Sequence, residues 1–402
     1  MNCLRAISYQ WLATAYVSVL SIGLSFVLGR TLGPILFGRY SFILSIVSIY
    51  YILQEGGFRT LLFREGTSLS KNLNFTENKL LGLAIGHVIV ASLSGVIVVT
   101  IVPLNFRWEI SSAIVCFGLL AVSGFCSARM KSEGLFEKEA VWQIILRTSS
   151  FLCIIAAIIC GSKNISVIFL LWSIGIAFAL TLPTGRYILK RPEFKINKEI
   201  YSANSAFLAV NAATVIYFRC DMVLLEYLGG GTATVGEYAA AYRLMEGVIV
   251  IMTPVAHIAF RHMRLNYAKK EYFNRIFLSL TSIMMVVGAI IYLIGTFVGG
   301  DIVDLIFGRE YSQAHYLIVL LLMALIFILP NYIITQAMIA LNKEKIYAYT
   351  AIAAAILNII GNLYMIPLSG AKGAAMVTVA TEAFLFFVLG YVYLKWLTNR
   401  DF

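Results

Sequence analysis

Long apolar stretches recur along the whole chain, and they restrict the fold more than any other feature. A helix needs about 20 mostly apolar residues to cross the hydrocarbon core of a bilayer. Such stretches lie near residues 8–29, 35–57, 80–103, 110–128, 140–160, 165–185, 201–228, 235–260, 276–298, 314–340, 346–366 and 371–394. Each is far longer than the roughly ten residues of alternating polarity typical of a membrane β-strand. The sequence therefore predicts an all-α, polytopic membrane protein with about 12 transmembrane helices.

The composition supports a membrane protein. Hydrophobic residues make up 60% of the chain and charged residues 13%, whereas soluble domains are about half apolar and a quarter charged. The net charge of +11 could suggest a nucleic-acid partner. The basic residues, however, lie in short segments between apolar stretches and form no patch with interleaved aromatic residues. We therefore expect the lipid bilayer, and no nucleic acid, as a partner.

The lysines and arginines indicate the orientation of the chain. If the N-terminus is cytoplasmic, 22 of the 31 basic residues fall in inner segments and six in outer segments. This asymmetry is typical of membrane proteins, whose cytoplasmic loops are enriched in Lys and Arg. It predicts a multi-pass protein of the cell inner (cytoplasmic) membrane, with an even number of spans and both termini cytoplasmic. Ten or fourteen spans would also satisfy it.

A charged segment at residues 186–199 divides the chain near its centre. Six predicted spans precede it and six follow, which indicates an internal duplication of the kind common in secondary transporters. We predict an N-terminal six-helix bundle at 1–190, a cytoplasmic linker at 191–200 and a C-terminal six-helix bundle at 201–402. The two halves also share a short pattern, because Leu-Gly, a small loop and Gly-x-Tyr occur at residues 32–40 and again at 228–238.

Several ionisable residues lie inside the predicted spans, where such groups are costly and usually functional. Guanidinium groups could bind a phosphate or pyrophosphate there through paired hydrogen bonds. The candidates for substrate binding in a cavity are Arg147, Arg219, Asp221 and Arg243. The candidates for ion coupling are Glu55, Asp221, Glu226, Glu246 and Glu382. The alternative is that these charges form ion pairs that fix helix packing, for which Arg243 and Glu246, three residues apart, are well spaced.

Several features of a catalytic protein do not occur in this sequence. It contains no GxxxxGK[ST] loop for nucleotide phosphates, and its His, Asp, Glu and Cys residues show no metal-ligand spacing. No segment between the spans is long enough to form a folded catalytic domain. We expect a protein that is not an enzyme and that has no cofactor or metal, with H⁺ or Na⁺ as the coupling ion.

The order of several motifs resembles a known family. The motifs are Leu28-Gly29-Arg30, Gly38-Arg39-Tyr40, residues 217–225 (YFRCDMVLL), Gly236-Glu237-Tyr238, residues 241–244 (AYRL), Asn358 to Asn362, and Gly370 to Ala375. In this order they are similar to those of the polysaccharide exporters, the O-antigen (Wzx-type) flippases of the multidrug/oligosaccharidyl-lipid/polysaccharide (MOP) exporter superfamily. The resemblance covers nearly the whole chain.

The resemblance implies both a fold and a cargo. The fold would be two six-helix bundles around a central cavity. The cargo would be undecaprenyl-pyrophosphate-linked oligosaccharide repeat units for O-antigen, lipopolysaccharide or another surface polysaccharide, moved between leaflets by alternating access. A polysaccharide polymerase and a chain-length regulator would be partners. Arg219 and Asp221 fall on the matching motif, whereas Arg147 and Glu382 are candidates because they lie in apolar stretches.

Two other functions compete with a flippase. A multidrug or small-cation antiporter of the same superfamily would need an acidic, aromatic cavity without a cationic anchor, and Arg147 and Arg219 disfavour it. A polytopic glycan polymerase would need catalytic groups on a sizeable outer loop. The longest predicted outer loop, near residues 299–313, is too short for that purpose.

Overall fold

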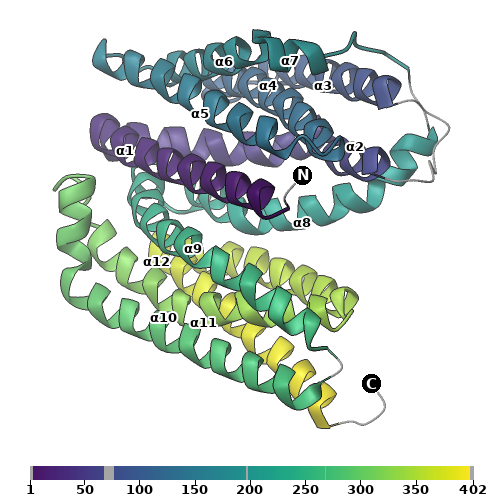
Figure 1. The fold of residues 1–402 in the computed structure, drawn as a ribbon. Coiled ribbons are helices and arrows are strands. Elements are labelled where there is room, and N and C mark those ends of the chain that lie inside the picture. The colour runs from purple at the N-terminus through teal and green to yellow at the C-terminus, as the bar shows by residue number, and fades with distance from the viewer. Residues whose placement is uncertain (1–2, 68–76, 196–197, 268, 399–402) are drawn as a thin grey trace. The chain divides into compact units, whose positions relative to one another are not determined.

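The protein is helical throughout the part that the structure describes, residues 3–67, 77–195, 198–267 and 269–398 of a computed structural model (Figure 1). No strand occurs among these residues. The helices are α1 (Cys3–Glu55), α2 (Phe58–Thr67), α3 (Glu77–Ile101), α4 (Arg107–Ser132), α5 (Phe136–Ile159), α6 (Ile165–Thr181), α7 (Pro183–Ile188), α8 (Lys198–Leu228), α9 (Thr232–Leu265), α10 (Lys270–Ile306), α11 (Ala314–Ala340) and α12 (Glu344–Thr398).

Two of these helices each contain two predicted spans. α1 breaks at Gly33 (φ 70°, ψ 173°) and α12 breaks at Gly370 (φ 56°, ψ −136°). Glycine adopts a positive φ at little cost because it has no Cβ. Pro34 follows the first break and Pro367 precedes the second. The stretches at 8–29 and 35–57, and those at 346–366 and 371–394, are therefore separate spans joined by tight breaks.

Seven of the described helices are long and apolar enough to cross a membrane: α1, α3, α4, α5, α10, α11 and α12. α6 is apolar but has only 17 residues, and α8 and α9 carry the internal charges noted in the sequence. When α1 and α12 are each divided at their breaks and the short helices α2 and α7 are left out, the described helices supply twelve segments that match the twelve predicted spans. The all-α polytopic fold is confirmed.

The ends of some spans differ from the prediction. α10 has 37 residues, from Lys270 to Ile306, and is about 55 Å long at 1.5 Å per residue. Hydropathy detects only its apolar middle, predicted at 276–298. α6 ends at Thr181, short of the predicted 185, because Leu182 has the extended backbone (ψ 154°) that a residue before proline prefers. Pro183 then begins the short helix α7.

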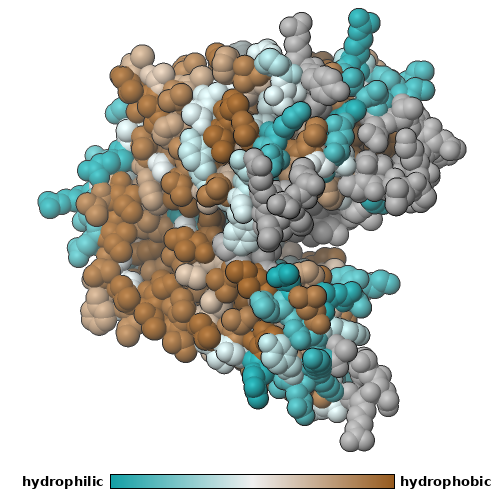
Figure 2. Space-filling model, in the orientation of Figure 1, coloured by the Kyte–Doolittle hydropathy of each residue, from teal (hydrophilic) through white to brown (hydrophobic). Residues whose placement is uncertain are grey.

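The surface along the helices is largely apolar (Figure 2). On α10 the exposed side chains include Ile290, Leu293 and Phe297. In the part formed by α10 and α12, hydrophilic side chains gather at the end where α10 begins. A large exposed apolar surface of this kind needs lipid as its solvent, which agrees with a multi-pass membrane protein.

The described chain packs into two compact units. One comprises Met1–Ser25 and Ile43–Val215, and the other comprises Phe26–Phe42 and Ile216–Phe402. We call them the first unit and the second unit. The middle of α1 thus packs with the C-terminal helices, and α8 contributes to both units. The linear division at residues 191–200 stays a prediction about the two bundles.

Part of the predicted linker packs on α3. The backbone N–H of Glu193 donates to the carbonyl oxygen of Gly82 at 2.9 Å. A Cβ on Gly82 would lie 2.8 Å from the carbonyl oxygen of Arg191, and one on Gly86 would overlap the carbonyl oxygen of Glu193. The two glycines, one helical turn apart, therefore let this extended segment lie directly on the helix backbone. Residues 196 and 197 of the linker lie outside the described residues.

The Gly-x-Tyr pattern seen in both halves forms a close backbone crossing in the second unit. A Cβ on Gly38 would overlap the carbonyl oxygen of Thr232, and a Cβ on Gly236 would overlap that of Pro34. Gly38 thus faces the first turn of α9, and Gly236 faces the first turn of the segment of α1 that follows Gly33. The relation is reciprocal, as expected of equivalent positions in a duplicated chain.

Gly236→Ala is expected to destabilise the protein. The new methyl group would meet backbone atoms that cannot rotate away, and overpacking of this kind costs about 1–3 kcal/mol. Gly247, on the same helix α9, has open space around its Cβ position, so Gly247→Ala should be neutral or gain up to about 1 kcal/mol of helix propensity. Thermal unfolding of the two purified variants in detergent measures the difference. Equal midpoints would show that the crossing is not tightly packed.

Candidate functional site

A buried carboxylate lies at the centre of the second unit. Glu382 on α12 is 7% exposed. Its Oε1 accepts a hydrogen bond from the Tyr217 hydroxyl of α8 at 2.7 Å. Its Oε2 accepts one from the Asn331 amide of α11 at 2.9 Å, and the same amide donates to the Glu382 carbonyl at 3.0 Å. Three helices thus meet at one acidic side chain, and the tyrosine hydroxyl and the amide that donate to it are neutral groups.

A second buried carboxylate, Asp221, lies one helical turn from Tyr217 on α8. It is 4% exposed. It accepts from the Tyr238 hydroxyl of α9 at 2.7 Å and from the backbone N–H of Met222 at 2.7 Å. The Tyr238 hydroxyl also lies 3.5 Å from the Thr378 hydroxyl of α12. We call Tyr217, Asp221, Tyr238, Asn331, Thr378 and Glu382 the carboxylate cluster.

Amide side chains extend the carboxylate cluster along α12. The Asn362 amide donates to Asn358 Oδ1 at 3.0 Å, and the Cys220 thiol donates to the same oxygen at 3.3 Å. Asn331 Oδ1 and Asn362 Oδ1 are buried and have no hydrogen-bond partner among the described residues. Buried polar atoms normally have partners, so these two oxygens are free to accept a proton donor or a cation.

The sequence reasoning missed these amides as site residues. Asn358 and Asn362 are four residues apart on one face of a helix, within an otherwise apolar stretch, and that spacing could have revealed them. Asn331 follows Pro330 in the middle of α11. The candidate residues were predicted from ionisable side chains within apolar stretches, and asparagine is uncharged.

Arg219 lies close to the carboxylate cluster on α8. The side chain is half-buried, and its Nη1 has no hydrogen-bond partner among the described residues. No ion pair joins Arg219 to Asp221 within the described part of the chain, since the two lie two residues apart and leave the helix in different directions. The electrostatic interaction between them is favourable. Arg219 therefore has an unused donor inside the second unit.

The other predicted charges of the second unit have different surroundings. Arg243 forms an ion pair with Glu246 one turn along α9, although the buried Arg243 Nε has no hydrogen-bond partner among the described residues. Glu226 on α8 interacts electrostatically with Arg39 of α1. Its Oε2 is likewise buried without a hydrogen-bond partner in that part of the chain.

The first unit contains the candidate Arg147 on α5. The side chain is half-buried, its Nε has no hydrogen-bond partner among the described residues, and it interacts electrostatically with Tyr51 and Arg59. A Cβ on Gly124 of α4 would lie 3.7 Å from Arg59 Cδ and 3.8 Å from the Tyr51 hydroxyl. Two arginines and a tyrosine hydroxyl therefore gather in the first unit, where they create a positive potential.

Glu55 has a local structural role in the first unit. Its carboxylate accepts hydrogen bonds from the backbone N–H of Gly57 at 3.3 Å and of Arg59 at 3.0 Å. Gly57 directly precedes α2 and Arg59 lies in its first turn, so the side chain caps that helix. Glu55 is 4% exposed and, like Arg147, does not belong to the carboxylate cluster.

The arrangement supplies two kinds of chemistry. In the second unit, carboxylates and amide oxygens could take up a proton or a monovalent cation. In both units, half-buried guanidinium groups with unused donors could bind an anion. No group of three or more His, Cys, Asp or Glu side chains suited to a metal ion occurs among the described residues.

Known structures share this fold. A multidrug-resistance MATE family transporter of the MOP superfamily, in an inward-facing conformation, has a TM-score of 0.71 at 11% identity, with 99% of this chain and 100% of that chain covered. The lipid II flippase MurJ, in an inward closed conformation, has a TM-score of 0.70 at 12% identity, with 96% and 87% covered. At these identities the likeness establishes the fold alone, which is that of MOP superfamily transporters.

A curated relative and a family model carry the comparison further. The chain is 25% identical over 198 residues to the "Probable low-salt glycan biosynthesis flippase Agl15" of Haloferax volcanii, which covers 48% of this chain and 42% of that protein. The match thus spans less than half the length of this relative. Residues 3–260, more than half of the chain, match the model of the family described as "Polysaccharide biosynthesis protein". The chain therefore belongs to the family described as "Polysaccharide biosynthesis protein".

Proposed function

We propose that the protein is a flippase for lipid-linked oligosaccharides. Its cargo is an undecaprenyl-pyrophosphate-linked repeat unit, moved from the cytoplasmic to the periplasmic leaflet by alternating access for O-antigen or another surface polysaccharide. The observation that carries this proposal is the pair of half-buried guanidinium groups, Arg147 and Arg219, each of which has a buried nitrogen without a hydrogen-bond partner among the described residues.

A pyrophosphate group suits these arginines. Each guanidinium group has five N–H donors in a planar fork that matches phosphate oxygens. Charge-assisted hydrogen bonds of this kind are about twice as strong as neutral ones. Cationic side chains inside a membrane protein are costly and usually mark a pathway or a ligand. An anionic headgroup that crosses the membrane would supply the missing acceptors, whereas a cationic drug would be repelled.

The names of similar proteins support the same class of cargo. The relative from Haloferax volcanii is named for glycan biosynthesis and for flipping, and MurJ is named as a flippase of lipid II. The family model is described by polysaccharide biosynthesis. These names do not mention O-antigen or undecaprenyl-pyrophosphate-linked repeat units. We propose both for this chain.

Ion coupling is assigned, within this proposal, to the carboxylate cluster. Asp221 and Glu382 are buried and accept from neutral donors, and a proton or a sodium ion would neutralise them in turn. The free amide oxygens of Asn331 and Asn362 would add ligands for sodium, which prefers oxygen donors. Glu226 and Glu246 remain secondary candidates, because an arginine lies close to each. Glu55 is a weaker candidate, since its carboxylate caps α2.

The cellular setting follows from the same proposal. The asymmetry of basic residues favours the inner membrane with both termini in the cytoplasm. The repeat units would be made on the cytoplasmic leaflet and joined on the other side, so a polymerase and a chain-length regulator would act on the product.

Deletion of the gene is expected to leave lipid-linked repeat units on the cytoplasmic leaflet, because their synthesis continues without transport. Spheroplasts are treated with a glycosidase that reaches only the outer leaflet, and the lipids are then extracted. The fraction of lipid-linked repeat units that stays uncleaved measures this accumulation. Expression of the intact chain should restore surface polysaccharide. Altered sensitivity to cationic dyes with normal surface polysaccharide would instead indicate the antiporter, and chain lengthening by the purified protein would indicate a polymerase.

A further inference from the structure

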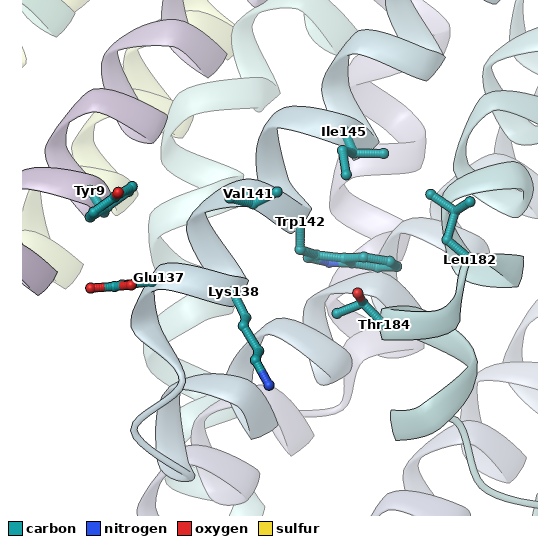
Figure 3. A pocket seen from close by; sticks show the side chains of 8 residues that line it. All are labelled: Tyr9, Glu137, Lys138, Val141, Trp142, Ile145, Leu182 and Thr184. Carbon is teal, nitrogen blue, oxygen red and sulfur yellow. The ribbon is translucent and has the colours of Figure 1, made fainter.

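A pocket lies in the first unit where α5 begins, away from the residues assigned to the cargo. Its volume is about 300 Å³, and α1, α5 and the junction of α6 with α7 line it. In Figure 3 the Glu137 side chain extends toward Tyr9 on one side of α5. Trp142 extends to the other side, toward Leu182 and Thr184, and Lys138 lies between the two groups.

The start of α1 is fastened beside this pocket. The Gln10 amide donates to the Phe136 carbonyl oxygen at 2.8 Å and to Glu139 at 2.7 Å. Further along the same two helices, the hydroxyls of Tyr16 and Thr148 lie 2.8 Å apart. The pocket is therefore a built feature between packed helices and does not depend on a loose segment.

Hydrogen-bond donors of three kinds lie around the pocket. The Trp142 indole is 1% exposed, and its Nε1–H has no acceptor among the described residues. Lys138 is exposed and forms no ion pair with a described residue. Thr184 adds an exposed hydroxyl. A ligand that suits an indole N–H, an ammonium group and a hydroxyl together is an anion rich in acceptor oxygens, such as a phosphate diester.

The indole is held in place from behind. A Cβ on Gly185 would lie 2.7 Å from Trp142 Cη2 and 2.8 Å from Cζ3, so the six-membered part of the ring packs directly on the backbone of α7. The nitrogen is covered in this structure, and binding therefore requires a local movement of the side chains above it.

The outer face of α5 indicates where such a ligand would come from. Val141, Leu152 and Ile159 are 48%, 59% and 80% exposed. At about 100° per residue these three positions share one helix face, and Val141 also lines the pocket. The pocket thus lies at one end of a row of exposed apolar side chains that is about 27 Å long at 1.5 Å per residue. The row is interrupted at Thr148, whose hydroxyl meets that of Tyr16. Acyl chains beside this row would bring a lipid headgroup to Lys138.

We propose that this pocket binds the phosphate group of a bilayer phospholipid. Lys138 pairs with the phosphate, the Thr184 hydroxyl donates to it, and the Trp142 N–H gains the acceptor that it lacks. The acyl chains lie along Val141 and Leu152. A bound lipid would join the start of α1 to α5 and α7. This site is separate from Arg147 and does not depend on the proposed cargo.

Thermal unfolding of the purified full-length protein in detergent tests this proposal. Phosphatidylglycerol should raise the unfolding midpoint. Diacylglycerol with the same acyl chains, which lacks the phosphate, and free inorganic phosphate, which lacks the chains, should not. An equal rise with diacylglycerol would show that only the acyl chains matter. An equal rise with inorganic phosphate would reveal a general anion site. Either result would overturn the proposal.

Two variants assign the effect to the pocket. Trp142→Phe removes the N–H and also the outer part of the ring that packs on α7, so we expect a lower midpoint without lipid. The rise that phosphatidylglycerol causes above that midpoint should be mostly lost. Lys138→Ala should lose most of the rise too, and it tests the site even if the first variant does not fold. Lys163→Ala, in the exposed segment between the end of α5 and the start of α6, is the matched control. A full rise in Lys138→Ala, or an equal loss in Lys163→Ala, would contradict a phosphate site here.

Discussion

Arg219→Ala is expected to slow transport of the lipid-linked oligosaccharide by about 10- to 100-fold, because a hydrogen bond to a charged group contributes about 1.5–3 kcal/mol. Abundance and membrane insertion should stay near wild type, since the Arg219 side chain forms no ion pair with a described residue that its removal would leave unpaired. Rates of surface-polysaccharide recovery after induction, normalised to protein abundance, measure the effect.

Two further variants refine the Arg219 experiment. Arg219→Lys keeps the charge but loses the planar fork of donors, so we expect an intermediate rate. Arg261→Ala removes an exposed arginine from α9 and should leave transport unchanged. If Arg219→Ala transports at the wild-type rate, this residue is no phosphate anchor. If the variant protein disappears from the membrane, the residue has a structural role instead.

Glu382→Gln is expected to uncouple transport from the ion gradient. Glutamine can still accept from Tyr217 but cannot exchange a proton or carry a charge. One elementary charge that moves through 100 mV supplies about 2.3 kcal/mol, or about 50-fold in accumulation. The variant should lose accumulation of that order in energised proteoliposomes, while exchange without a gradient continues. Replacing sodium with potassium at fixed pH then shows whether H⁺ or Na⁺ is the coupling ion.

The matched control is another buried carboxylate of the same unit. Glu237 on α9 is 7% exposed and accepts from the backbone N–H of Ala314 at 2.8 Å, at the start of α11. Glu237→Gln should lower stability but keep the gradient dependence. Asp221→Asn should behave as Glu382→Gln does if the whole carboxylate cluster takes part. Full gradient dependence in both cluster variants would place the coupling elsewhere.

The spans were predictable because bilayer thickness imposes a length on every crossing helix. The same argument could not find the ends of α10, whose amphipathic ends extend beyond its apolar middle. The break at Gly33 was detectable because Pro34 follows it directly, and the break at Gly370 because Pro367 lies three residues before it. The packing of residues 26–42 with the C-terminal helices could not be predicted, because hydropathy contains no information on which helices are neighbours.

The candidate site was predictable only where charge was involved. The spacing of Arg243 and Glu246 indicated a pair on one helix face, and the structure contains it. The contacts of Glu382 with Tyr217 and Asn331 join residues up to 165 positions apart, and no local pattern encodes them. The unused N–H of Trp142 could not be foreseen either, since a buried tryptophan usually has a partner.

Reconstitution of the purified protein tests the central claim most directly. Liposomes would carry a fluorescent undecaprenyl-pyrophosphate oligosaccharide in both leaflets, and a membrane-impermeant quencher would report which molecules reach the outer leaflet. We predict that wild-type protein makes the protected fraction accessible and that Arg219→Ala does so far more slowly. Protein that leaves this fraction protected under a proton or sodium gradient, but transports a cationic dye, would contradict the flippase account.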